Sequence, residues 1–125
     1  MSKQYAVIGL GRFGSAVALG LAEAGQEVIA VDIEEERVQQ VSDDVTYAAV
    51  ADVTKNGVCE SLGFANIDVA VIGISSNMED SILATIMTKE AGAKYIVAKA
   101  VSDIHATILQ KVGADQIVFP ERDSG

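Results

Sequence analysis

The sequence predicts an α/β fold in which a six-stranded parallel sheet carries helices on both faces. Short β-branched runs alternate with helical segments from one end of the chain to the other. Residues 69–72 and 96–98 are apolar on both sides of the chain, as strands covered by helices on each face must be. This alternation implies parallel strands joined by right-handed crossovers. Three strands in each half give a Rossmann-like, doubly wound sheet.

The apolar runs and the segments between them give the expected elements in order. We expect strands at residues 4–9, 26–32, 46–51, 67–73, 94–99 and 115–119. We expect helices at residues 12–24, 34–42, 54–62, 77–91 and 102–112. Gly57 costs ~1 kcal/mol in a helix interior relative to alanine, so the third helix is expected to be irregular. Glycine closes four helical segments, at Gly25, Gly63, Gly92 and Gly113.

Three of these glycines precede a polar strand end by the same spacing of seven residues. The pairs are Gly25 with Asp32, Gly92 with Lys99, and Gly113 with Pro120. These strand ends, together with Glu121, are therefore expected at the carboxyl edge of the sheet. Ligands bind at that edge in open α/β sheets.

Composition limits the domain count and the class of partner. The 125 residues are expected to form one domain over residues 1–125, and half of them are hydrophobic. Eighteen acidic residues against nine basic ones give a net charge of −9, which argues against a nucleic-acid partner and against adsorption to an anionic membrane. No apolar run is long enough for insertion into a membrane. The single cysteine, Cys59, is expected to be a packing residue of a cytoplasmic protein.

The most specific motif is Gly9-Leu10-Gly11-Arg12-Phe13-Gly14, which lies between the first strand and the first helix. In such a motif the first glycine allows a tight turn, the second lets the backbone approach a pyrophosphate, and the third lets the helix pack against the strand. Asp32 ends the next strand, 18 residues beyond Gly14. A carboxylate at this spacing accepts hydrogen bonds from ribose hydroxyls. The motif therefore predicts a nucleotide site.

The residues after Asp32 bear on which nucleotide binds. They are Ile33 and Glu34, which offer no positive charge to a 2′-phosphate, so NADP is disfavoured. Arg37 has two interpretations that both stay open: a residue that stacks or bridges near an adenine, or part of a solvated helix face.

Two further strand ends carry polar residues with open interpretations. Asp52, followed by Val53, is either an N-cap of the third helix or a contact to the base. After Gly73, Ser75 and Asn77 are either a helix start or contacts to a phosphate or ribose.

The sequence offers no convincing catalytic group. Tyr95 and Lys99 match a dehydrogenase Tyr-x-x-x-Lys pair, but the segment predicts a strand, in which four residues span ~13 Å, so the two side chains cannot cooperate. His105 is the only histidine and is expected on a helix surface. We therefore expect a protein that binds a nucleotide and is not an enzyme.

The chain resembles the N-terminal, TrkA-N, domain of the regulators of potassium conductance, in the branch of Trk/Ktr potassium-uptake regulatory subunits. The resemblance covers essentially all 125 residues. It is carried by residues 5–14, by Val31-Asp32, by Ala51-Asp52-Val53-Thr54, and by the segments 61–63, 98–100 and 112–121.

This resemblance implies a cytoplasmic subunit, at the inner face of the membrane, that gates a potassium transporter subunit. It implies a homo-oligomer in which dimers build a ring, often octameric, whose shape responds to ATP or ADP, or to NAD or NADH. It also implies a crossover helix and a second domain after residue 125. Arg12 would read a terminal phosphate, Lys99 would face the phosphates or the distal end of a dinucleotide, and Glu121 would meet a metal cation at the dimer contact.

The sequence departs from the family pattern in one of these motifs. Asp52 lies in Ala-Asp-Val-Thr, whereas Gly-Asp-Ala-Thr is common in the family. The cofactor domain of an NAD-dependent oxidoreductase remains the main alternative, and a small methyltransferase is the weakest. The residues expected to contact the nucleotide are Gly9, Gly11, Arg12, Phe13, Gly14, Asp32, Ile33, Arg37, Asp52, Val53, Gly73, Ser75, Asn77, Lys99 and Glu121.

Overall fold

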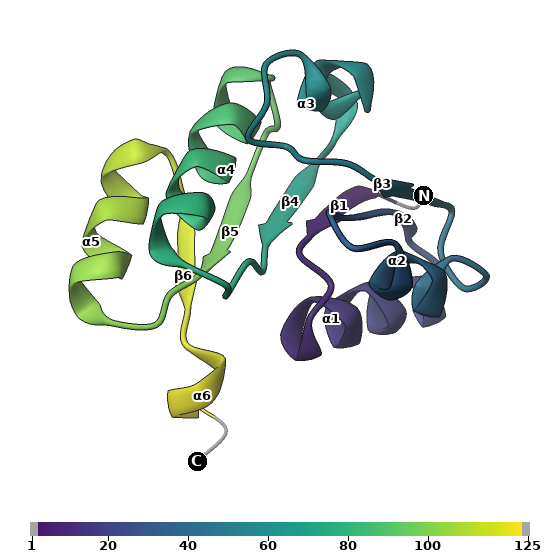
Figure 1. Ribbon diagram of the computed structural model, residues 1–125, viewed down its shortest axis with the longest axis horizontal. Helices are drawn as coiled ribbons and strands as arrows, with labels where there is room; N and C mark the ends of the chain where they lie inside the picture. The colour runs from purple at the N-terminus through teal and green to yellow at the C-terminus, as the bar shows by residue number, and fades with distance from the viewer. Residues whose placement is uncertain (1–2, 124–125) are drawn as a thin grey trace.

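The computed structural model describes residues 3–123 and consists of one twisted parallel sheet between two layers of helices (Figure 1). The six strands are β1 (Gln4–Ile8), β2 (Glu27–Asp32), β3 (Tyr47–Val50), β4 (Val69–Ile72), β5 (Ile96–Lys99) and β6 (Gln116–Val118). Their order in the sheet is β3-β2-β1-β4-β5-β6, and every pairing is parallel. The predicted doubly wound α/β fold is confirmed.

The order of the strands places a switch point between β1 and β4. The chain leaves β1 toward β2 and β3, then returns to the other side of β1 to form β4, β5 and β6. Ile8 is in register with Val31 on one side and with Ile72 on the other. Crossovers that run in opposite directions leave a crevice at the carboxyl ends of these strands.

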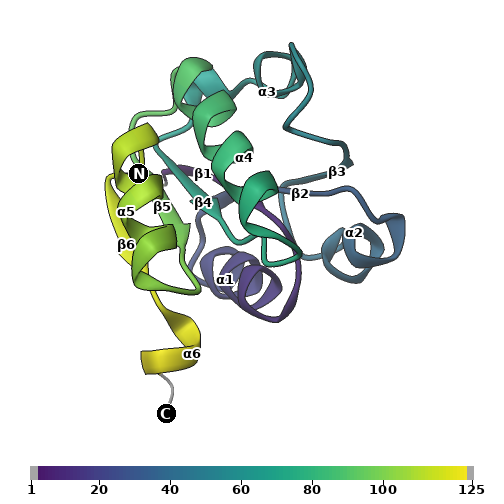
Figure 2. The same cartoon turned by 60° about the vertical axis from the view of Figure 1, so that its left-hand side comes forward.

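The helices are α1 (Arg12–Glu23), α2 (Glu35–Val41), α3 (Val58–Ser61), α4 (Met78–Glu90), α5 (Asp103–Val112) and α6 (Pro120–Asp123), with a 3₁₀ turn η1 (Phe64–Asn66). Helices α1 and α2 cover one face, and α3, α4 and α5 cover the other (Figure 2). Helix α6 extends away from the sheet in both views.

Alternate residues of the central strands pack into two separate cores. Val7 of β1 packs toward α1 and α2, whereas Ala6 and Ile8 pack toward α4 and α5. The same alternation holds in β4, where Val71 faces the first core and Ile72 the second. This burial on both faces explains why the strands lack an apolar–polar alternation in the sequence.

The third helix is much shorter than expected. We expected residues 54–62, but α3 has one turn that begins at Val58. Gly57 has φ +81°, which is left-handed and cannot lie inside a right-handed helix, so residues 54–57 form turns instead. The four glycines expected to close helical segments, Gly25, Gly63, Gly92 and Gly113, all have positive φ, which confirms that expectation.

The expected surface position of His105 is wrong, because its side chain is buried between α5 and α4. The backbone N–H of Val101 donates to Nδ1 over 3.1 Å, so the ring proton lies on Nε2. Nε2 then donates to Ser81 Oγ over 2.6 Å, and Ser81 Oγ donates to Met78 O. Sequence patterns could not show this because a polar partner on another helix satisfies the histidine.

Cys59 is a buried packing residue, as expected. Its thiol contacts Val53 O and Thr88 Oγ1. Burial disfavours the thiolate and raises the pKa of the thiol to about 11.

We predict that His105 makes the fold less stable as the pH falls below 6.5. Burial lowers the pKa of His105 from its ordinary value of 6.5, and protonation would direct a second N–H at the Val101 N–H. The unfolded chain therefore takes up the proton first, and the folded state loses relative stability as the pH falls. Urea unfolding of wild type and His105→Gln at pH 7.5 and pH 5 checks this, and wild type should lose more stability. Equal losses in both proteins would contradict the prediction.

Candidate functional site

A cavity of about 110 Å³ opens at the carboxyl edge of the sheet, beside the switch point between β1 and β4. The loops after β1, β2, β3 and β4 all contribute to its walls. The residues that line it are Ile8, Gly9, Gly11, Val31, Asp32, Ile33, Glu34, Arg37, Ala51, Asp52, Val53, Thr54, Gly73, Ile74, Ser75, Ser76 and Asp80.

Two of the three motif glycines are required by the packing of the turn between β1 and α1. A Cβ at Gly14 would lie 1.7 Å from the carbonyl oxygen of Gly9. Gly9 has φ +93°, and a Cβ there would lie 2.8 Å from the backbone nitrogen of Ile74. These positions hold the turn against both α1 and the loop after β4, so the fold alone accounts for their glycines.

Gly11 differs, because nothing in the described part of the protein requires glycine there. A Cβ at this position would have Arg37 Nη1 as its nearest atom, 3.9 Å away. The missing side chain therefore leaves open space over the first turn of α1. No side chain caps this helix N-terminus within residues 3–123, and no acidic residue lies in its first turn. The first N–H groups of a helix lack intrahelical acceptors and attract anions.

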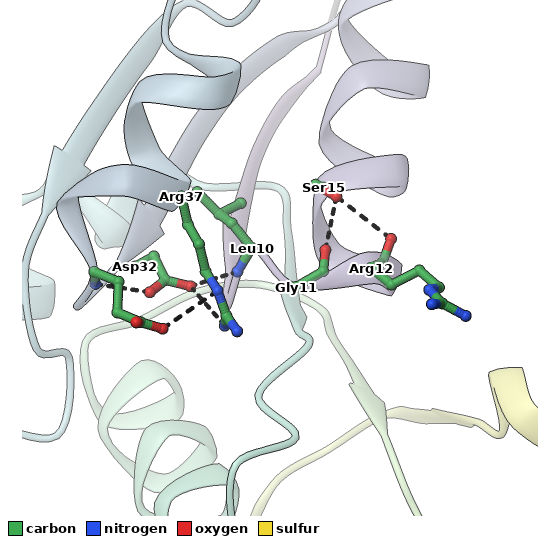
Figure 3. Close-up of polar contacts among 7 residues, drawn as sticks. Leu10, Gly11, Arg12, Ser15, Asp32 and Arg37 are labelled. Atoms are coloured by element: carbon green, nitrogen blue, oxygen red, sulfur yellow. Dashed lines mark hydrogen bonds and ion pairs between the residues drawn. The ribbon is translucent and has the colours of Figure 1, made fainter.

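Asp32 ties the glycine turn to the end of β2. Its side chain is 5% exposed, and Oδ2 accepts a hydrogen bond of 2.7 Å from the backbone N–H of Leu10 (Figure 3). Oδ1 accepts another of 2.8 Å from the backbone N–H of Glu34. A carboxylate oxygen accepts two hydrogen bonds, so each retains capacity for a ligand hydroxyl.

Arg37 extends from α2 toward Asp32 and the glycine turn (Figure 3). Its Nη1 lies 3.8 Å from Asp32 Oδ2, and its Nε lies 3.3 Å from Glu34 Oε2. The side chain is 48% exposed, so Arg37 forms a part of the cavity wall that is open to solvent. The structure thus brings Arg37 into the site beside the ribose-binding candidate Asp32.

Asp52 is not the N-cap of α3, since that helix begins at Val58, six residues later, with Gly57 as its N-cap. Asp52 Oδ1 instead accepts hydrogen bonds from the Thr54 hydroxyl, at 2.6 Å, and from the Thr54 backbone N–H, at 2.9 Å. The Thr54 hydroxyl is the main cause that lowers the pKa of the Asp52 carboxyl. Asp52 therefore stays ionised at the cavity wall, where it accepts hydrogen bonds.

The residues of the loop after β4 have two roles: some line the cavity, and one caps α4. Gly73 and Ser75 line the cavity. Asn77 is the N-cap of α4, with Oδ1 accepting from the backbone N–H of Asp80 over 2.7 Å. The helix-start interpretation of Asn77 is confirmed.

Six of the expected site residues lie outside the cavity lining. Gly14 and Phe13 pack beneath the turn, where Phe13 contacts the Gly73 position, and Asn77 caps α4. Arg12 is exposed and extends away from Asp32 and Arg37 (Figure 3). Lys99 and Glu121 are the remaining two.

Lys99 and Glu121 lie at the same sheet edge but form a separate pair. Strands β1 and β4 separate β5 from β2, so Lys99 is three strand spacings, ~14 Å, from Asp32. Lys99 Nζ is buried and lies 3.0 Å from Glu121 Oε1, and Lys99 is the main cause that lowers the pKa of Glu121. Within residues 3–123 no group of three His, Cys, Asp or Glu side chains is arranged to hold a metal ion.

Tyr95 and Lys99 do not cooperate, as predicted from the strand pattern. The Tyr95 hydroxyl bonds Gln116 Oε1 over 3.1 Å, whereas Lys99 pairs with Glu121 beyond the other end of β5. The chemistry of a phenol activated by an adjacent ammonium is therefore excluded for this pair.

Sequence reasoning missed eight residues of the cavity wall: Ile8, Val31, Glu34, Ala51, Thr54, Ile74, Ser76 and Asp80. Seven of them lie within two residues of an expected site residue in the sequence, so widening each strand end would have found them. Asp80 lies in the first turn of α4, and only the orientation of that helix brings it to the cavity.

The charged side chains of the cavity lining are mostly acidic. The lining contains the carboxylates Asp32, Glu34, Asp52 and Asp80 and one basic side chain, Arg37. It contains no histidine, cysteine or lysine, and its hydroxyl groups come from Thr54, Ser75 and Ser76. The described helices include none that is both long enough and apolar enough to cross a membrane.

The family model of the TrkA-N domain matches residues 5–120 of this chain. The Ktr system potassium uptake protein C of Bacillus subtilis is 44% identical over 123 residues, which are 98% of this chain and 56% of that protein. The Ktr system potassium uptake protein A of Vibrio alginolyticus is 46% identical over the same shares. The chain thus spans about half the length of the curated relatives it matches.

Solved structures with lower identity share the fold. The TrkA-N domain of the inner membrane protein ybaL from Escherichia coli has a TM-score of 0.86 and 17% identity, covering 99% of this chain and 92% of that one. The GsuK channel bound to NAD has a TM-score of 0.80 and 14% identity, covering 94% of this chain and 21% of that one. GsuK bound to ADP has a TM-score of 0.83 and 14% identity, covering 98% and 32%.

We predict that Gly14→Ala destabilises the fold by about 3 kcal/mol, because the new Cβ would overlap the Gly9 carbonyl oxygen and force the turn away from α1. Gly20→Ala in the same helix is the matched control. A Cβ at Gly20 meets nothing within 4 Å, so this change should stabilise the protein by up to about 1 kcal/mol. Urea unfolding measures both, and equal stability of the two variants would contradict the packing assigned to Gly14.

Proposed function

We propose the function of this chain from the premise that it belongs to the TrkA-N domain family, to which residues 5–120 match. The chain is the adenine-nucleotide-binding domain of a cytoplasmic regulatory subunit that controls potassium uptake. The nucleotide occupies the cavity at the switch point, and its exchange changes the shape of the assembly to which the domain belongs.

The open space over Gly11, next to the buried carboxylate of Asp32, is the observation that carries the proposal. Packing explains Gly9 and Gly14 but leaves Gly11 without a structural reason to be glycine. A phosphate over this turn would receive backbone N–H donors at the start of α1. Asp32 borders the same cavity and keeps acceptor capacity for ribose hydroxyls.

The remaining wall supports a position for the base on the side of β3. Ile33, which is 65% exposed, offers apolar surface there, and Val53, although only 3% exposed, also lines the cavity. Asp52 supplies an ionised acceptor beside them, and an adenine amino group is a matching donor. This placement supports an adenine nucleotide over an unsubstituted phosphate or sugar.

The ligand is ATP or ADP, or NAD or NADH, and NADP is disfavoured. Asp32 and Glu34 place two negative charges where a 2′-phosphate would lie, against the one positive charge of Arg37. The named structures with this fold include GsuK bound to NAD and GsuK bound to ADP, so the scaffold accommodates both ligands. The role of Arg12 as a reader of the terminal phosphate stays a prediction, since its side chain extends away from the cavity.

The regulatory role comes from the relatives. Two proteins of Ktr potassium uptake systems are 44% and 46% identical over nearly the whole of this chain. We accordingly assign this chain a homo-oligomer, built from dimers into an octameric ring, that acts on a membrane potassium-transporter subunit. The lack of histidine, cysteine and lysine in the cavity lining supports a sensor over an oxidoreductase.

We predict that Gly11→Ala weakens ADP binding about tenfold or more while leaving the fold intact. The added Cβ would fill the space that the phosphate needs, yet it would meet only Arg37 Nη1, at 3.9 Å. Titration calorimetry with ADP, ATP, NAD and NADH measures the affinities, and urea unfolding should show a change below about 1 kcal/mol.

Gly20→Ala, in the same helix and away from the cavity, is the matched control and should bind like wild type. Absence of binding by wild type to all four nucleotides would contradict the proposed function. Unchanged ADP affinity in Gly11→Ala would contradict the placement of the phosphate over α1.

A further inference from the structure

We propose that Arg37 makes the cavity select phosphorylated nucleosides over nucleosides, by moving its guanidinium from Asp32 and Glu34 onto the phosphate bound over Gly11. This inference rests on the proposed function and assigns it a specificity-determining residue.

The charge of the cavity wall creates the need for such a residue. Four carboxylates line the cavity, from Asp32, Glu34, Asp52 and Asp80, against the single positive side chain of Arg37. The start of α1 supplies only about half of a positive charge through its aligned peptide groups. A phosphate that enters this wall therefore meets net repulsion unless Arg37 turns toward it.

Arg37 already borders the space that a phosphate would occupy. Its Nη1 is the nearest atom to the position of a Cβ on Gly11, at 3.9 Å. The guanidinium lies between Asp32 and the glycine turn (Figure 3). A rotamer change, without backbone movement, is enough to bring its donors onto an oxygen above the first turn of α1.

The present contacts of Arg37 are loose enough to exchange. Its two ion-pair distances, 3.8 Å to Asp32 and 3.3 Å to Glu34, exceed the 2.7–2.9 Å of strong charge-assisted hydrogen bonds. Half of the side chain is in solvent, where such pairs contribute little to stability. A bidentate contact to a phosphate would be shorter and stronger than either pair.

The Asp32 carboxylate keeps its backbone hydrogen bonds after Arg37 leaves it. Asp32 receives backbone N–H groups from Leu10 and from Glu34, at 2.7 and 2.8 Å, whether or not the guanidinium is nearby. Departure of Arg37 also clears the approach of ribose hydroxyls to Oδ2. Binding of a nucleotide thus replaces the two loose ion pairs of Arg37 by a contact to the phosphate and a ribose contact to Asp32, whereas a nucleoside offers Arg37 no phosphate.

The test compares adenosine, AMP and ADP by titration calorimetry on wild type, Arg37→Gln and Arg37→Lys. Wild type should bind AMP and ADP more tightly than adenosine. Arg37→Gln should lose about tenfold to a hundredfold for AMP and ADP and less than about twofold for adenosine. Arg37→Lys should retain part of the preference, since it keeps the charge but not the bidentate geometry.

Lys111→Gln is the matched control, because it makes the same change in net charge in the last turn of α5, outside the cavity. It should leave all three affinities unchanged. Urea unfolding of Arg37→Gln should match wild type within about 0.5 kcal/mol, as for an exposed ion pair.

If wild type binds these ligands, two results would overturn the inference on Arg37 without contradicting the proposed function. One is an equal loss of adenosine and ADP affinity in Arg37→Gln, which would place Arg37 on the base or ribose. The other is no loss for any ligand, which would make Arg37 a surface residue. Failure of wild type to bind adenosine, AMP and ADP would instead overturn the proposed function, and this inference with it.

Discussion

The hydrogen bond from the backbone N–H of Leu10 to Asp32 Oδ2 is the interaction on which the site depends. It spans 2.7 Å between the turn after β1 and the end of β2, and the carboxylate that accepts it is buried. Buried carboxylates persist when backbone donors hold them, and Asp32 has two. This contact fixes the glycine turn beside the Asp32 carboxylate, so one residue sets the relative positions of the proposed phosphate and ribose contacts.

The glycine turn divides its functions between folding and binding. Gly9 and Gly14 are glycine because other backbone atoms occupy the places of their side chains. Gly11 is glycine where the protein leaves the place empty. The same turn therefore closes the β1–α1 connection and exposes the start of α1, and a mostly acidic cavity wall acquires one region that attracts anions.

The sequence predicted the sheet, the helices on both faces and the strand ends that line the cavity, because β-branched runs, glycine stops and the glycine motif are local signals. It misjudged His105 and missed Asp80, because the positions of both depend on another element. His105 is buried because Ser81 Oγ of α4 accepts a hydrogen bond from its Nε2–H, and Asp80 reaches the cavity through the orientation of α4. Asp52 accepts a hydrogen bond from the Thr54 hydroxyl, because Gly57 makes α3 begin only at Val58. Lys99 shares the sheet edge, but two strands separate it from Asp32.

The most direct measurement is the amide spectrum of ¹⁵N-labelled protein during addition of ADP. If the nucleotide lies over α1, the largest changes in chemical shift should fall on the N–H groups of residues 11–14 and of Leu10. The Leu10 N–H donates to Asp32 Oδ2. Shifts concentrated around Val101 and Phe119, by the Lys99–Glu121 pair, with an unchanged glycine turn, would contradict this placement.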